Sequence, residues 1–177
     1  MLRIAGQVLT PRLIVFDKDG TLIAFDALWH TWFRCLLEEL AVRVQMDTCT
    51  QAGLAETLGY DPDTGVWDPR GPLTLASVGE VALLIAGQLY RCRHIPWEEA
   101  LTIVEQARRA AHARVQQMNL VHPIGDVRGL FSRLRSEGLL LALATTDDRA
   151  PTLHALEKLG VSALLATVVC GDDGMPP

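Results

Sequence analysis

Three short apolar runs near the two ends of the chain have the pattern of strands in a parallel sheet. They are residues 13–16 (LIVF), 139–144 (LLLALA) and 166–170 (ATVVC). Continuous apolar runs of this length, without alternation, are typical of strands that are covered on both faces. We therefore expect all three strands to be buried on both faces of one sheet.

Short helical patterns separate the second and third of these runs from what precedes them. One begins at Val127 and ends at Gly138, and the other covers residues 150–159 and ends at Gly160. Glycine directly after an apolar helical pattern is a common left-handed stop. Strand, helix, strand, helix, strand predicts a parallel, right-handed α/β sheet of the Rossmann-like kind.

The middle of the chain has a different period. Apolar residues recur every fourth position from Leu28 to Val44, which predicts an amphipathic helix, and further helices are expected over about 75–90 and 96–118. The Gly/Pro/Asp-rich stretch 59–72 predicts a loop without regular structure. We expect an all-helical domain over residues 24–121, inserted into an α/β core made of residues 1–23 and 122–177.

Composition excludes some classes of function. The net charge is −5 and Lys/Arg-rich runs are absent, which argues against a nucleic-acid partner. The apolar stretch 71–90 is interrupted by three glycines, so a core-facing helix is expected there and no membrane span. Cys35, Cys49, Cys92 and Cys170 are far apart in sequence, which predicts reduced thiols and a cytoplasmic protein.

Polar residues follow each predicted strand. The first run leads into Asp17-Lys18-Asp19-Gly20-Thr21, the second into Thr145-Thr146-Asp147, and the third into Gly171-Asp172-Asp173-Gly174. In open α/β sheets, ligands bind beyond the carboxyl ends of the strands. We therefore expect these residues to form one site at that edge of the sheet.

The chain resembles the haloacid dehalogenase-like (HAD) superfamily over essentially its whole length. DKDGTL (17–22) is similar to the first motif of that family, D-x-D-G-T-[LV], and LLLALATT (139–146) to its second. The helical insertion is similar to a C1 cap, as in phosphoglycolate phosphatase-like members. The resemblance implies a Mg²⁺-dependent phosphatase that acts on a small phosphorylated metabolite.

The resemblance also implies roles for individual residues. Asp17 would be the nucleophile that forms an aspartyl-phosphate, and Asp19 would protonate the leaving oxygen and then activate water. Asp17 and Asp19, the latter by its backbone carbonyl, would hold the Mg²⁺ ion. Gly20, Thr145 and Thr146 would bind phosphate. For Thr145, a hydroxyl that caps the following helix is an equally open interpretation.

The third family motif supplies a lysine and the fourth supplies acids, and neither has a match in this sequence, where Asp172 and Asp173 come too early. We therefore expect a C-terminally truncated form with weak or absent activity. Residues 13–16 would then lie at an apolar sheet edge, through which the chain could self-associate.

Other functions stay open. The main alternative is a catalytically dead remnant that binds phosphate or a protein. Within the superfamily, a phosphomutase is harder to exclude than a dehalogenase, because Asp19 has no role in attack on carbon. The acidic stretch 61–68 lacks the glycine and glutamate of an EF-hand, so a turn-rich loop is expected there and no Ca²⁺ site.

Overall fold

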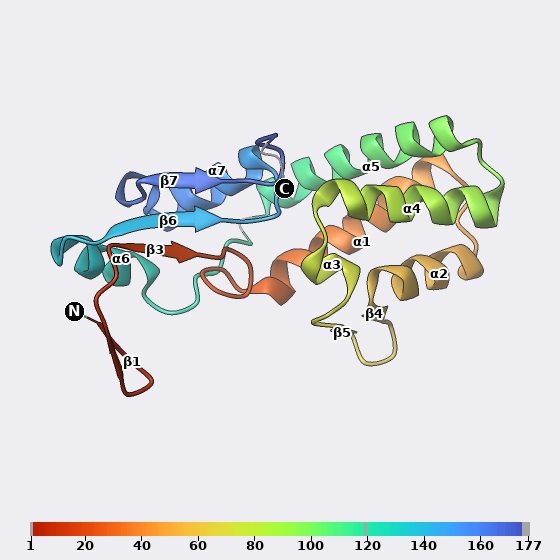
Figure 1. Ribbon diagram of the computed structural model, residues 1–177. Helices are drawn as coiled ribbons and strands as arrows, with labels where there is room; N and C mark the ends of the chain where they lie inside the picture. The colour runs from red at the N-terminus through yellow and green to blue at the C-terminus, as the bar shows by residue number, and fades with distance from the viewer. Residues whose placement is uncertain (1, 119, 175–177) are drawn as a thin grey trace. The chain divides into compact units, whose positions relative to one another are not determined.

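A computed structural model describes residues 2–118 and 120–174 of the chain. The chain divides into two compact units, residues 1–27 with 121–177, and residues 28–120. Figure 1 shows the helices and strands of both. That the two units act as a catalytic core and a cap domain stays a prediction.

The first unit contains a parallel three-stranded sheet. Its strands are β3 (Leu13–Phe16), β6 (Leu140–Ala144) and β7 (Thr167–Val169), in the order β3-β6-β7. All three run in the same direction, as the arrows in Figure 1 show. The α/β class and the parallel sheet predicted from the sequence are confirmed.

Two helices cover one face of this sheet. They are α6 (Val127–Ser136), which precedes β6, and α7 (Arg149–Leu159), followed by the 3₁₀ turn η1 (Ser162–Leu164), which precedes β7. Phe131 of α6 and Leu156 of α7 pack in one cluster with Leu141 and Leu143 of the sheet. Successive right-handed crossovers that step in one direction along a sheet place their helices on the same face.

The opposite face of the sheet is partly exposed in the described residues, so the prediction that all three strands are buried on both faces is wrong. Leu13, Val15 and Leu140 are 47%, 56% and 49% exposed, so β3 and β6 are not buried on both faces. Alternate residues of a strand point to opposite faces, and only the Ile14 and Phe16 side of β3 meets the helix-covered core. An apolar run indicates a strand, but it does not say how many of its faces are covered.

A short antiparallel hairpin precedes the sheet, and the sequence patterns did not predict it. Its strands are β1 (Leu2–Ile4) and β2 (Gln7–Leu9), paired from Leu2 with Leu9 to Ile4 with Gln7. Each strand has three residues, which is too short for an alternating pattern to be recognised.

The second unit is mainly helical. Its helices are α1 (Phe25–Arg43), α2 (Thr48–Leu58), α3 (Pro72–Leu75), α4 (Val78–Arg93) and α5 (Trp97–Gln117). Side chains cap two of them: Asp47 accepts a hydrogen bond from the Thr50 amide at the start of α2, and Ser77 forms a capping box with Glu80 at the start of α4. Within the described residues, no helix is long and apolar enough to cross a bilayer.

The stretch 59–72 is not entirely irregular, which corrects the expectation of a loop without regular structure there. It contains a two-residue hairpin, β4 (Tyr60–Asp61) and β5 (Val66–Trp67). The Asp61 carboxylate accepts hydrogen bonds from the Asp63 amide (2.9 Å) and the Thr64 hydroxyl (2.8 Å), which closes the turn. The Tyr60 and Trp67 rings lie 4.5 Å apart and hold the two strands together.

Candidate active site

A tight loop follows β3 and carries the first group of polar residues. The amides of Leu22 and Ile23 both donate to the Lys18 carbonyl (2.9 and 3.1 Å), and the Gly20 amide donates to the Ile23 carbonyl (2.8 Å). Gly20 has a φ of +78°, while a Cβ at this position would meet no atom within 4 Å. Glycine is therefore favoured here by the backbone angle and not by lack of space.

The ends of the three parallel strands meet, as expected from the fold class. Phe16 is paired with Leu143 at the end of the β3–β6 ladder, and the Thr145 amide donates to the Val169 carbonyl (3.0 Å). The Gly171 amide donates to the Asp147 carbonyl (2.9 Å). The structure thus brings the three polar segments to one edge of the sheet.

Gly171 allows the second and third segments to approach closely. A Cβ on this residue would lie 2.3 Å from the Thr146 carbonyl oxygen, closer than real Cβ atoms come to backbone. The role of this glycine could not be predicted from the sequence, because a close approach between two loops leaves no local pattern. Its function in the fold is to let the β7 loop lie directly against the β6 loop.

Asp17 is the acidic residue at the tip of β3. Its side chain is exposed, and the Thr21 hydroxyl donates to its Oδ2 atom over 3.2 Å. An exposed carboxylate beside the ends of two further strands can contact a solvent-borne ligand. The role of nucleophile predicted for Asp17 requires this accessibility.

Asp19 lies deeper and is ion-paired. Its side chain is 15% exposed, and its Oδ2 atom is 2.7 Å from the Lys18 Nζ atom. The same ammonium group is 3.1 Å from Oδ2 of Asp147, beyond the end of β6. Burial lowers the pKa of Lys18, but Asp19 and Asp147 raise it by more, so that the pKa lies above its ordinary value.

Lys18 and Asp147 are members of the site that the sequence analysis did not single out. Lys18 is only 1% exposed and Asp147 only 4% exposed. A lysine between two aspartates in a loop motif is expected to point to solvent, and its burial depends on a carboxylate more than a hundred residues away. Asp147 itself was part of the predicted polar segment, but without an assigned role.

Thr145 and Thr146 lie at the end of β6. The Thr145 hydroxyl accepts a hydrogen bond from the Asp147 amide (3.2 Å), which is a local turn and not a cap on α7. The first amide of α7, that of Arg149, donates instead to Asp172 Oδ1 (2.8 Å). Thr146 is exposed, and its carbonyl packs against Gly171. Binding of phosphate by these two residues stays a prediction.

The acids after β7 are arranged around Arg149. The Arg149 Nε atom is 2.6 Å from Asp173 Oδ1, and its Nη2 atom donates to the Val168 carbonyl (2.9 Å). The Arg149 guanidinium and the Cys170 amide hold the pKa of Asp173 below its ordinary value. Asp173 thus stabilises the fold of this loop.

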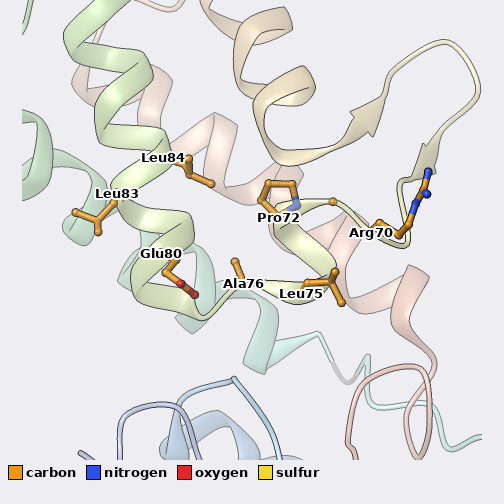
Figure 2. Close-up of a pocket in the computed structure, with 8 residues that line it drawn as sticks. Arg70, Pro72, Leu75, Ala76, Glu80, Leu83 and Leu84 are labelled. Atoms are coloured by element: carbon orange, nitrogen blue, oxygen red, sulfur yellow. The ribbon is translucent and has the colours of Figure 1, made fainter. Parts of the chain in front are cut away.

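The helical unit has an apolar hollow of its own, of about 600 Å³, shown in Figure 2. It lies between the segment before α3, α3 itself and the first turns of α4. Leu75, Leu83 and Leu84 give it apolar walls, and Arg70 stands at one end. Glu80 also lines it, but its carboxylate accepts from Ser77 in the capping box.

Solved structures of similar fold include three hydrolases. A predicted phosphoglycolate phosphatase from Haemophilus somnus matches with a TM-score of 0.64, at 15% identity, over 94% of this chain and 64% of its own. The HAD hydrolase YfnB from Bacillus subtilis, solved with magnesium, matches with a TM-score of 0.56, at 16% identity, over 92% of this chain and 66% of its own. A 2-haloacid dehalogenase from Pseudomonas syringae matches with a TM-score of 0.52, at 18% identity, over 93% of this chain and 65% of its own.

These likenesses establish the fold and nothing further, because all three structures are less than 20% identical to this chain in sequence. The chain spans about two thirds of the length of the first two relatives. No curated protein matches it. The model of one family, however, matches residues 11–174, which include all three strand ends described above. The chain therefore belongs to the haloacid dehalogenase-like hydrolase family.

Proposed function

We propose that this protein is a Mg²⁺-dependent phosphatase that hydrolyses a small phosphorylated metabolite through an aspartyl-phosphate on Asp17. One observation carries the proposal. The exposed Asp17 carboxylate and the ion-paired Asp19 carboxylate lie two residues apart, where three parallel strands end together. Membership of a hydrolase family supports the reaction class.

In the first step, a carboxylate oxygen of Asp17 forms a bond to phosphorus while the bond from phosphorus to the ester oxygen breaks. The leaving oxygen takes a proton from Asp19, which has to be in its protonated form for this step. In the second step, a water molecule gives its proton back to Asp19 and its oxygen attacks phosphorus, which releases Asp17 and inorganic phosphate. Gly20, Thr145 and Thr146 are proposed to bind the phosphate oxygens.

The residues present are suited to Mg²⁺, which prefers oxygen ligands. Asp17 is exposed and accepts one long hydrogen bond, from Thr21, so its carboxylate can bind a cation. Asp17 and the backbone carbonyl of Asp19 are the proposed ligands. When bound, Mg²⁺ supplies positive charge that offsets repulsion between the nucleophile and the phosphate. The magnesium in the Bacillus relative supports this choice of metal.

We propose that turnover is weak in this chain. Lys18 and Arg149 are the cations that the described residues place at these strand ends, and each is ion-paired with aspartate. A phosphate would therefore lack a free lysine of the kind that the third family motif supplies. The loss of one electrostatic group of this type costs about 3–4 kcal/mol of activation free energy.

The test is hydrolysis of p-nitrophenyl phosphate with Mg²⁺. We expect turnover that stops on chelation and that Asp17→Asn lowers by at least about 10³-fold, as loss of a nucleophile commonly does. Glu157→Gln, an exposed position on α7, is the matched control and should keep wild-type activity. An Asp17→Asn variant that stays as active as this control would overturn the proposal.

The second candidate is a phosphate- or protein-binding module without activity. The paired state of Lys18 and Arg149 and the exposed apolar side chains Leu13, Val15 and Leu140 favour it. Wild-type protein that has no Mg²⁺-dependent turnover but binds phosphate in calorimetry would support this module. The likeness to a dehalogenase concerns fold alone, and Asp19 argues against attack on carbon.

Expectations about partners and compartment remain predictions. We propose a cytoplasmic protein without nucleic-acid or membrane partners, which the net charge of −5 and the four free cysteines support. Self-association through the edge of β3 is also proposed, and sedimentation equilibrium at increasing protein concentration would detect it.

A further inference from the structure

We propose that Lys18 is a positioning residue: its buried ammonium group fixes the Asp19 carboxylate in the orientation from which it exchanges protons with the substrate. The proposal rests on the function proposed above. It assigns a task to the second residue of the DKDGTL motif, whose two neighbours, Asp17 and Asp19, are the proposed reacting acids.

Burial between two carboxylates fixes the position of the Lys18 ammonium group. Lys18 is 1% exposed, whereas Asp17 on one side of it is exposed and Asp19 is 15% exposed. Burying an ammonium ion costs several kcal/mol unless partners compensate. Two carboxylates do so here, Asp19 at 2.7 Å and Asp147 at 3.1 Å. The ammonium group therefore has a fixed place, although the side chain that carries it is long and flexible.

Asp147, the second partner of Lys18, is itself held in place by hydrogen bonds. Its Oδ1 atom accepts from the Asp148 amide (2.9 Å), and its own amide donates to the Thr145 hydroxyl (3.2 Å). Its carbonyl accepts from the Gly171 amide (2.9 Å). Asp147 is thus attached to the loops of β6 and β7, and Lys18 connects that fixed point to Asp19 in the loop of β3.

Stability alone does not require these buried charges. Apolar residues of similar volume commonly replace a buried ion pair with no loss of stability, and sometimes with a gain. An apolar side chain at position 18 cannot, however, orient a carboxylate. Direct binding of phosphate by Lys18 is disfavoured, because the ammonium group is buried and already contacts two carboxylates.

The test compares two substrates that differ in leaving group. Nitrophenolate leaves without a proton, whereas an alkoxide needs the proton of Asp19. We expect Lys18→Met to lower kcat/KM for glycerol phosphate at least about tenfold more than for p-nitrophenyl phosphate, as misplacement of a general acid should. KM should change little, and Asp19→Asn should show the same preference for the better leaving group.

Asp147→Asn is the second variant, because it keeps the ion pair between Lys18 and Asp19. It tests the positioning role if Lys18→Met fails to fold. It should shift the ratio of the two substrates in the same direction by a smaller factor. Equal losses on both substrates for the variant that folds would overturn the positioning role alone. Absence of Asp17-dependent turnover on either substrate would overturn the proposed function and the positioning role with it.

Discussion

At the scale of single residues, the site depends on contacts between loops that are distant in sequence. Asp17, Asp19 and Thr145 could be singled out from the sequence because they come within three residues of the end of an apolar strand and match family motifs. Lys18 could not, because its burial is set by Asp147 in another loop. Local patterns report which residues end a strand, but not which of them turn inward.

Gly171 gives a prediction at this scale. Gly171→Ala should destabilise the protein by about 1–3 kcal/mol, because the new Cβ would press on the Thr146 carbonyl and force the two loops apart. The measurement is the urea midpoint of unfolding. Gly79→Ala is the control: a Cβ there meets no atom within 4 Å, and alanine in α4 should be neutral or stabilising. Equal midpoints for the two variants would contradict this explanation.

At the scale of elements, the sequence predicted the strands better than their surroundings. β3 has the predicted bounds, 13–16, and α7 ends at Gly160 in a left-handed conformation, as expected. The two hairpins were missed because strands of two or three residues carry no period. The exposed face of β3 was missed because burial is decided by crossover direction, which an apolar run does not encode.

The connection between α7 and the loop after β7 gives a prediction about pH. The pKa of Asp173 is lowered by Arg149 and the Cys170 amide, so its stabilising effect is present above its ordinary pKa and lost as pH falls through the lowered value. Asp173→Asn should therefore be less stable than wild type at about pH 6, and the difference should narrow at about pH 3, below the ordinary pKa of aspartate.

Urea midpoints at the two pH values measure this difference. Glu157→Gln, which lies on α7 away from the ion pair with Arg149, is the matched control and should follow wild type at both. A stability gap between Asp173→Asn and wild type that stays constant as pH falls would show that Asp173 is not held as an ion by Arg149.

At the scale of the whole molecule, the fold and the family could be predicted from the amino-acid sequence, but the substrate could not. A parallel sheet with polar strand ends could be predicted from apolar runs and their boundaries, and the family match over residues 11–174 agrees with it. Substrate choice depends on side chains that follow no readable spacing. The apolar hollow of the helical unit could not be predicted either, because its residues come from the segment before α3, from α3 and from α4.

The central claim is that Asp17 becomes covalently phosphorylated, and it can be tested by trapping that intermediate. In the Asp19→Asn variant, Asp17 should still attack the phosphorus of the substrate when the leaving group is nitrophenolate, but the variant lacks the base that activates water. After incubation of this variant with p-nitrophenyl phosphate and Mg²⁺ and an acid quench, peptide mass spectrometry should find phosphate on Asp17. Turnover of p-nitrophenyl phosphate with a phosphate adduct on another residue, or with none, would contradict the account.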